Sequence, residues 1–517
     1  MAFYRSVATI GSWTMGSRVL GFIRDILIAD VLGAGMVADA FFVSFKLPNF
    51  FRRLFAEGAF NAAFVPLFGG RLHDGGLGVA KRFAGEATAV LLSWLLLFTA
   101  AAMLAMPWLM QVIAPGFAGI PEKFALTVDL ARIMFPYLLF MALTALLSGV
   151  LNSLERFAAA AAAPIVLNVV LISTLILVLS GLVDNAGYAL SWGVAAAGIA
   201  QFLLLCFATG RAGAMFDLPR PRLTPGVKRL LVLMGPGLIG AGVVQINLVV
   251  DTILATLVGE GAVSFLYYAD RVNQLPLGVV GVAIGVALLP LLTRQLRAGA
   301  EAEAADSQNR AIEFALLLTV PAAAALVAVP EPIVTVLFQR GRFDAATAEA
   351  TAAALRAFAL GLPAYVLVKT LTPGFFARED TVTPVKIAAV AVALNIVLAV
   401  SLMQVLAHVG IALATAIAAW INAGCLAVVL ARRGHFRPDT RLGRRAPRTV
   451  VAALVMGLLL WLAAGPMTPL FSGALGVRIA ALTALVIGGV AAYAVLAQVT
   501  GAGSVSEIRA MLRRRAS

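Results

Sequence analysis

The stretch "AFFVSFKLPNFFRRLFAEGAFNAAFVPLF", residues 40–68, combines two conflicting properties. Most of its residues are apolar, and an apolar run longer than about 18 residues is typical of a helix that crosses a membrane. It nevertheless contains Lys46, Arg52, Arg53 and Glu57. Charged side chains are costly in hydrocarbon, so they face a partner or a water-filled cavity. The stretch therefore predicts a membrane-embedded helix with a polar face.

The composition extends this prediction to the whole chain. Of its 517 residues, 62% are hydrophobic and only 12% are charged, whereas a soluble domain is usually about 45–50% apolar and about 25% charged. The net charge of +14 lies mainly in short loops between apolar runs, so it does not indicate a nucleic-acid partner. We predict an all-α polytopic membrane protein.

The sequence contains no pattern for catalysis or for a cofactor. It has no P-loop, no glycine-rich dinucleotide turn and no paired metal-binding histidines. Cys206 and Cys425 each lie within an apolar run and give neither a disulfide framework nor a metal spacing. We therefore expect that the protein is not an enzyme, with no catalytic residues, no metal and no cofactor. A coupling ion is left undetermined.

The apolar runs divide into fourteen predicted membrane spans. Several exceed the about 20 residues that cross hydrocarbon, so we expect tilted helices or interfacial ends. The predicted spans are 7–32, 37–68, 83–113, 124–151, 158–181, 187–208, 229–257, 263–293, 311–329, 348–370, 385–405, 408–430, 449–466 and 476–499.

The loops between these spans alternate in charge. The loops on one side, together with both termini, hold 26 Lys and Arg residues, and the opposite loops hold 4. Short cytoplasmic loops carry the excess of Lys and Arg. The alternation therefore predicts that both termini lie in the cytoplasm.

The chain also repeats itself. "LGAGMVADAFFVSFKLP" (32–48) is similar to "VGEGAVSFLYYADRVNQLP" (258–276), at an offset of six predicted spans. An even number of spans keeps the two copies parallel, so their lobes would be related by a pseudo-two-fold axis along the membrane normal. We predict a six-helix lobe at 1–210, a second at 225–431, a cavity between them, and two extra spans at 449–499.

The charges of the first two spans fall on shared helix faces. At about 100° per residue, Asp39, Lys46 and Arg53 lie on one stripe, and Ser17 lies on the same face as Arg24. Two structural alternatives exist for such charges. They can form ion pairs with one another and have no other role, or, if they lie near a span end, their side chains can extend to the membrane interface. For Lys46 and Arg53, a purely structural role is as well supported as a functional one.

The intramembrane cations outnumber the acids that could neutralise them, and arginine prevails among them. Arginine stays ionised when it is dehydrated, and its planar fork matches phosphate oxygens bidentately. The surplus therefore favours a phosphate or diphosphate site. The cations of this set are Arg18, Arg24, Lys46, Arg52, Arg53 and Arg271, and the acids are Asp25, Asp39, Glu57 and Asp270, with Asp30 nearer the outer end.

Three stretches of the chain resemble one known family. "SRVLGFIRDILIADVLGAGMVADAFFVSFKLPNFFRRLFAEGAFNAAFVPLF" (17–68) closely resembles the N-terminal signature of the MurJ (MviN) family, and "YYADRVNQLPLGVVGVAIGVALLPLL" (267–292) and "FQRGRFD" (338–344) extend the match. These proteins are bacterial lipid II flippases of the multidrug/oligosaccharidyl-lipid/polysaccharide exporter superfamily. The resemblance implies that the chain moves undecaprenyl-diphosphate-linked peptidoglycan precursor from the cytoplasmic to the periplasmic leaflet by alternating access.

The resemblance also implies roles for individual residues. The substrate-binding positions of the family correspond to Arg18, Arg24, Asp25, Arg52 and Arg271. Asp39 and Ser264 match positions at the periplasmic gate, and Glu57 matches the cytoplasmic side. We count Ser17 and Arg53 as supporting residues because of the faces they share with Arg24 and Lys46. Arg356 and Lys369 match less closely, and their roles are left open.

The partners and the location follow from the same resemblance. It implies the bacterial cytoplasmic (inner) membrane, with lipid II and membrane lipids as partners, and leaves other cell-wall synthesis proteins open. A flippase for another polyprenyl-diphosphate-linked glycan is the nearest alternative, because its ligand also carries a diphosphate. A cation-coupled drug antiporter would use cavity acids and twelve spans, and a non-transporting scaffold would not need buried arginines.

Overall fold

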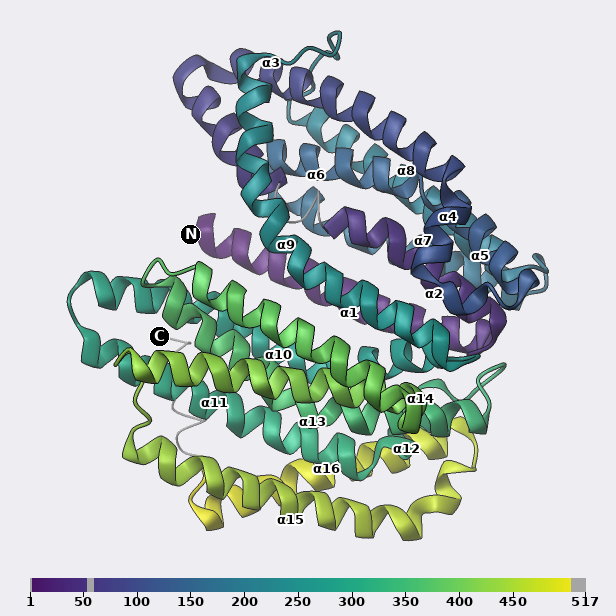
Figure 1. Cartoon of the computed structure of the whole chain (residues 1–517), viewed down its shortest axis with the longest axis vertical. Coiled ribbons are helices and arrows are strands. Elements are labelled where there is room, and N and C mark those ends of the chain that lie inside the picture. Colours follow the sequence, from purple (N-terminus) through teal and green to yellow (C-terminus); the bar gives the residue numbers. More distant parts are fainter. Residues whose placement is uncertain (1, 54–59, 504–517) are drawn as a thin grey trace. The chain divides into compact units, whose positions relative to one another are not determined.

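A computed structural model of the chain describes the backbone of residues 2–53 and 60–503, and the side chains of this part except 2–10, 236–244, 279, 282, 283 and 286. Within these residues the fold is entirely helical (Figure 1). The helices are α1 (Ala2–Leu32), α2 (Met36–Arg52), α3 (Phe60–Leu104), α4 (Met106–Ile113), the 3-10 helix η2 (Pro115–Phe117), α5 (Pro121–Met134), α6 (Tyr137–Ser153), α7 (Phe157–Leu179), α8 (Ala186–Arg211), α9 (Pro225–Val258), α10 (Ala262–Arg297), α11 (Glu301–Ala328), α12 (Pro330–Phe338), α13 (Ala345–Phe376), α14 (Val382–Arg432), α15 (Thr440–Phe471) and α16 (Leu475–Thr500).

The helices confirm the predicted polytopic membrane class. Nine helical segments among the described residues are long and apolar enough to cross a membrane, and each of the fourteen predicted spans coincides with helix in this part of the chain. Helices α3 and α14 each join two predicted spans, and the breaks fall at Gly76 (φ 71°) and Ala407 (φ 50°). Helices α1, α2 and α10, which carry the predicted site charges, are not among the nine.

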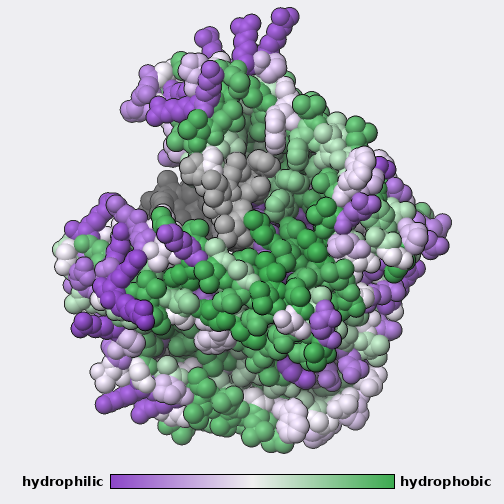
Figure 2. All heavy atoms as spheres, in the orientation of Figure 1, coloured by the Kyte–Doolittle hydropathy of each residue, from purple (hydrophilic) through white to green (hydrophobic). Residues whose placement is uncertain are grey.

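On the face that Figure 2 shows, hydrophobic side chains cover much of the surface, and hydrophilic side chains gather mostly toward its edges. Leu454, Leu458 and Trp461 on α15 and Ile487 and Val490 on α16 are exposed. A helix whose outer face is also apolar is suited to contact with lipid. The chain is therefore a multi-pass membrane protein.

Packing divides the chain into two compact units. Unit 1 consists of Met1–Ser264 and Arg340–Phe343, and unit 2 consists of Phe265–Gln339 and Asp344–Ser517. The packing boundary falls after Ser264, whereas the repeat placed a lobe boundary in the proline-rich segment near 210–225. The units are defined by packing contacts and the lobes by the sequence repeat, so the two divisions of the chain need not coincide. The lobes inferred from the repeat stay a prediction.

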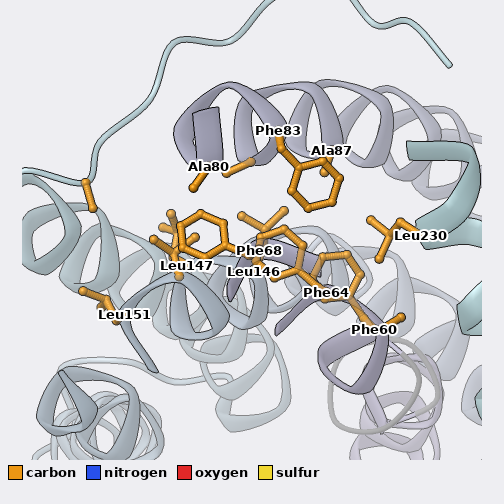
Figure 3. Packing of buried hydrophobic residues seen from close by; sticks show 14 of the residues in the cluster. Phe60, Phe64, Phe68, Ala80, Phe83, Ala87, Leu146, Leu147, Leu151 and Leu230 are labelled. Carbon is orange, nitrogen blue, oxygen red and sulfur yellow. The ribbon is translucent and has the colours of Figure 1, made fainter. Parts of the chain in front are cut away.

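Helix α9 packs into unit 1 at both of its ends. Leu230 joins a buried cluster built on Phe60, Phe64 and Phe68 of α3, which are spaced four residues apart and so share one face (Figure 3). Near the other end, a Cβ on Gly116 would lie 1.9 Å from the carbonyl oxygen of Thr256, so only glycine permits this approach of η2 to α9. These contacts explain why α9 belongs to unit 1.

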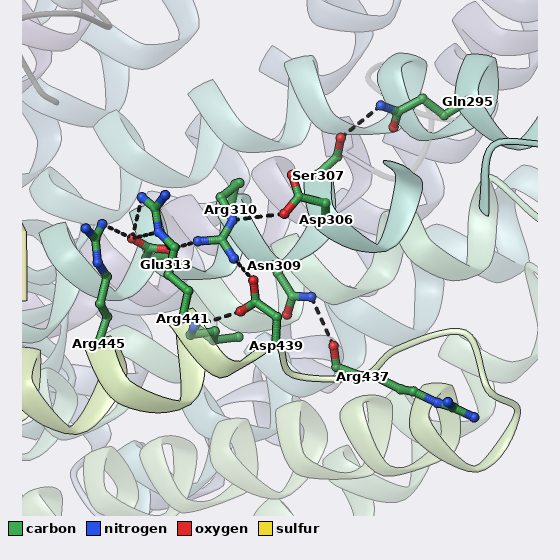
Figure 4. Close-up of polar contacts among 11 residues, drawn as sticks. Gln295, Asp306, Ser307, Asn309, Arg310, Glu313, Arg437, Asp439, Arg441 and Arg445 are labelled. Atoms are coloured by element: carbon green, nitrogen blue, oxygen red, sulfur yellow. Dashed lines mark hydrogen bonds and ion pairs between the residues drawn. The ribbon is translucent and has the colours of Figure 1, made fainter. Parts of the chain in front are cut away.

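In unit 2, helix α15 is joined to α11 by an ionic cluster at its N-terminal end (Figure 4). Glu313 of α11 accepts from Arg445 at 2.5 Å and from Arg441 at 3.1 Å, and it also pairs with Arg310. Arg310 in turn pairs with Asp439, which caps α15 by accepting from the amide of Leu442 at 2.7 Å. Three arginines and three acids, Asp306 included, thus join α15 to α11.

Candidate functional site

The first cluster of site residues lies in unit 1 between α1 and α7, which pack along each other (Figure 1). The Nε and Nη2 atoms of Arg24 donate to Oδ1 of Asp25 at 3.1 and 2.7 Å, and Nη1 donates to Oδ1 of Asn168 at 3.0 Å. The amide nitrogen of Asn168 donates to the carbonyl oxygen of Ser17 at 2.9 Å. The structure thus brings Ser17, Arg24 and Asp25 together and adds Asn168.

The burial of this cluster defines its electrostatics. Arg24 is 8% exposed, Asp25 3% and Asn168 4%. A guanidinium this deeply buried has lost its hydration, so it needs an anion and further acceptors in the protein. Hydrogen bonds to charged groups, which contribute about 1.5–3 kcal/mol each, offset this loss. Asp25 supplies the anion and Asn168 supplies the neutral acceptor. We call Ser17, Arg24, Asp25 and Asn168 the arginine cluster.

The other predicted cations take different positions. Arg18 and Arg53 are exposed. Arg52 is half-buried and donates from Nε to Oδ1 of Asn49 at 3.0 Å. Arg271 belongs to unit 2, where its guanidinium lies 4.7 Å from the centre of the Tyr267 ring. Glu57 lies outside the described residues.

Lys46, Arg356 and Lys369 have local surroundings of their own. The ammonium of Lys46 donates to Oγ1 of Thr252 on α9 at 2.6 Å, which ties α2 to α9 within unit 1. Arg356 is exposed and donates to the carbonyl oxygen of Val327 at 3.2 Å. Lys369 is exposed as well. The contact of Lys46 with a neutral hydroxyl suits a structural role.

A second cluster surrounds Asp39 of α2. Its Oδ1 accepts from the backbone nitrogen of Ser264 at 3.0 Å and from the hydroxyl of Ser264 at 2.6 Å. Its Oδ2 accepts from the ammonium of Lys123 at 2.7 Å and from the backbone nitrogen of Gly261 at 2.8 Å. Asp39 and Ser264 are fully buried and Lys123 is 2% exposed. We call these four residues the aspartate cluster, and all of them belong to unit 1.

The local backbone explains how the aspartate cluster forms. Gly259 (φ 144°) and Gly261 (φ 82°) adopt positive φ values in the turn between α9 and α10, where a side chain would be strained. This turn presents the amides of Gly261 and Ser264, at the start of α10, to Asp39. Amides of a helix's first turn have no intrahelical partner and carry partial positive charge, so they favour a carboxylate.

Two side chains of the clusters were missed from the sequence, as was the backbone amide of Gly261. Asn168 is a lone amide in the apolar run "PIVLNVVLI" (164–172), and an isolated polar residue in a predicted span is a usable signal of a buried contact. Lys123 stands in "GIPEKFAL" (119–126), which we placed at a loop edge. Only the packing of α5 against α2 buries its ammonium, so no local pattern reveals it.

Comparisons with known proteins identify the family. The family model "Lipid II flippase MurJ" matches residues 28–482. "Probable lipid II flippase MurJ" of Rhizobium meliloti (strain 1021) is 49% identical over 522 residues, which cover 100% of this chain and 97% of that protein. "Lipid II flippase MurJ" of Burkholderia cenocepacia is 35% identical over 90% of each chain.

Solved structures agree on the fold. "Lipid II flippase MurJ, inward closed conformation" superposes with a TM-score of 0.80 at 23% identity, over 95% of this chain and 98% of that one. An inward-facing multidrug resistance MATE family transporter of the MOP superfamily gives a TM-score of 0.70 at 13% identity, over 82% of this chain. At these identities both likenesses concern the fold alone. With the family model and the relatives, they lead to one conclusion: the chain belongs to the lipid II flippase MurJ family.

Proposed function

We propose that the protein is a lipid II flippase, which moves undecaprenyl-diphosphate-linked peptidoglycan precursor from the cytoplasmic to the periplasmic leaflet. The observation that carries the proposal is the 49% identity, along the whole chain, to a relative named as a probable lipid II flippase. The likeness to a MATE transporter gives no comparable support to drug transport, because at 13% identity it concerns the fold alone.

We place the substrate's diphosphate at the arginine cluster, with Arg18 and Arg52 of the same unit as further candidates. Arg271 of unit 2 stays a separate candidate for substrate binding. Two N–H groups of Arg24 already converge on one oxygen of Asp25, and the same fork can hold a phosphate oxygen. Asp25 then acts as the internal anion that occupies Arg24 while the site is empty. A diphosphate would replace this carboxylate, and Asn168 would keep the guanidinium in place during the exchange.

The aspartate cluster serves as a latch on the periplasmic side in an alternating-access cycle. Three of its hydrogen bonds join Asp39 to the turn and first residues of α10. Each of these bonds joins buried groups, so no water competes for it while the cluster is closed. The latch therefore favours one closed arrangement of α2 and the start of α10.

The remaining assignments concern the membrane. We place the protein in the bacterial inner membrane, with both termini in the cytoplasm, because the loops divide 26 to 4 in Lys and Arg. Lipid II and membrane lipids are its partners, and other cell-wall synthesis proteins are candidates. A cysteine in place of Glu260 should then be labelled from outside the cell, whereas one in place of Glu303 should not.

Complementation tests the function. The gene is expressed in a bacterium depleted of its own lipid II flippase, and we expect growth and normal cell shape to return. A strain that lacks a flippase for another polyprenyl-diphosphate-linked glycan serves as the second arm, where we expect no rescue. Rescue of the second strain alone would transfer the proposal to the other glycan, and rescue of neither would overturn it.

A further inference from the structure

The fixed part of the aspartate cluster is the pair Asp39–Lys123. Helices α2 and α5 pack along each other, and a second bond joins them where the hydroxyl of Ser44 donates to the carbonyl oxygen of Thr127 at 2.8 Å. Thr127 also donates its hydroxyl to the carbonyl oxygen of Lys123 at 2.7 Å. The two charged residues therefore lie on a helix pair that is held together independently of α10.

Lys123 has a second partner that does not involve α10. Its ammonium lies 4.1 Å from the centre of the Phe117 ring in η2. A buried ammonium over an aromatic face gains electrostatic stabilisation. If the first turn of α10 moves away, Lys123 keeps both Asp39 and Phe117.

The start of α10 provides the other three donors to Asp39, and all three are neutral groups. If Lys123 lost its charge, these donors would be the principal compensation of a fully buried carboxylate. Releasing them would then leave an uncompensated charge in a dry site, which is far more costly than breaking neutral hydrogen bonds.

We propose that Lys123 is a positioning residue of the transport cycle, the permanent counter-ion that keeps Asp39 charged and makes release of α10 reversible. This role rests on the proposed function, because the opening step belongs to alternating access. The ion pair remains intact in the open and closed arrangements, and only the neutral donors of α10 are released.

The proposal predicts effects of opposite sign for the two charges. In Lys123→Met, Asp39 depends on the donors of α10, so the latch opens less often. In Asp39→Asn, an NH2 group replaces one carboxylate oxygen and cannot accept from the donors that this oxygen binds. Each oxygen binds a donor from α10 or the turn before it, so the latch opens more often. The double variant Asp39→Asn/Lys123→Met buries neither charge, so the frequency of opening returns toward that of the unchanged protein. Simple damage to the fold would shift both single variants in the same direction.

Cysteine labelling of the full-length protein tests this directly. Ala262 is 2% exposed, so a cysteine there, in a chain with Cys206 and Cys425 replaced by alanine, reports opening. The protein is purified in lipid nanodiscs and treated with a membrane-impermeant maleimide at pH 8. We expect labelling to slow at least about tenfold in Lys123→Met and to quicken at least about tenfold in Asp39→Asn. Lys386→Met, an exposed lysine on α14, is the matched control and should label at the unchanged rate.

The outcomes separate this inference from the proposed function. Equal labelling of Lys123→Met and the unchanged protein, or a shift of both single variants in one direction, would overturn the role of Lys123. The assay contains no lipid II, so its result stands whatever the complementation experiment gives. If Lys123→Met does not fold, the double variant Asp39→Asn/Lys123→Met replaces it in the test. The proposed role of Lys123 requires that this double variant folds and is labelled within about threefold of the rate of the unchanged protein.

Discussion

The arginine cluster and the aspartate cluster each contain a buried ion pair, but the charge at the centre of the hydrogen bonds is a cation in the first and an anion in the second. In the arginine cluster, a cation at 8% exposure is bound by the carboxylate of Asp25 and the amide of Asn168. In the aspartate cluster, a fully buried carboxylate is held by an ammonium, two backbone amides and a hydroxyl. Each cluster contains one acid and one base, yet the central charge differs in sign.

This difference indicates different tasks. The central cation of the first cluster can exchange its anion, because another anion satisfies the same fork. The central anion of the second cluster has four donors from three parts of unit 1, so it ties these parts to one another. We interpret the first cluster as a site for an exchangeable anionic ligand and the second as an internal latch.

The largest expected effect is that of Arg24→Ala. The loss of charge-assisted hydrogen bonds at about 1.5–3 kcal/mol each should lower the flipping rate at least about 100-fold and abolish complementation. Arg24→Lys should be partly active at best, because the fork is lost. The measurement is growth of the depleted strain, with membrane levels of the protein determined in parallel.

Two controls make the Arg24 result interpretable. Arg24→Ala/Asp25→Asn removes both charges and avoids a bare buried carboxylate, and we expect it to be inactive although folded. Arg220→Ala removes an exposed arginine from the segment between α8 and α9 and should grow normally. Normal growth of the double variant at native expression would contradict the anion-exchange interpretation.

The next effect in size is that of Asn168→Asp. A second carboxylate beside Arg24 would bind the guanidinium permanently, so flipping should fall by about tenfold to 100-fold while the protein becomes no less stable. Asn168→Leu removes one hydrogen bond and should cost less, about tenfold. The ratio of the two rates in cells is the measurement, and a slower Asn168→Leu than Asn168→Asp would argue against competition for Arg24.

Ser264→Ala should have a smaller effect, confined to the latch. It removes the hydroxyl bond at 2.6 Å and leaves the backbone bond at 3.0 Å. A hydrogen bond to a charged group contributes about 1.5 kcal/mol or more, so opening should rise about tenfold or more. Labelling of the cysteine at position 262 measures it, and a decrease in labelling would show that the hydroxyl does not hold the latch closed.

Lys46→Met should have the smallest effect. Its ammonium donates to the hydroxyl of Thr252, and we expect a loss of stability of about 1.5–3 kcal/mol with growth retained. Thermal unfolding in detergent and complementation together check this. Loss of growth in a variant of normal stability would move Lys46 from a structural to a functional role.

Sequence reasoning anticipated part of both clusters. It placed Ser17 and Arg24 on one face, and the structure joins them through Asn168. The family resemblance named Asp39 and Ser264 as gate residues, and the structure brings their side chains within 2.6 Å. Their role as a gate stays a prediction. The helical class and the positions of the spans followed from apolar runs, because hydrocarbon leaves the backbone few alternatives to a helix.

The rest depended on tertiary packing. In the sequence, Lys123 is indistinguishable from a lysine at the edge of a loop, and only the packing of α5 against α2 buries it. The close approach of η2 to α9 at Gly116 depends on atoms more than a hundred residues apart in sequence. The break within α3 at Gly76 occurs where the sequence predicted a loop, because a glycine at positive φ turns the chain without interrupting the neighbouring helices.

The most direct test is the amount of lipid II in the outer leaflet of a flippase-depleted bacterium that carries this gene. An enzyme that cleaves lipid II and cannot enter the cell measures this amount. We predict that the unchanged protein restores cleavable lipid II, and that Arg24→Ala/Asp25→Asn, at equal protein levels in the membrane, leaves it at the level of the empty strain. Full cleavage with the double variant, or none with the unchanged protein, would contradict a lipid II flippase that holds its substrate through Arg24.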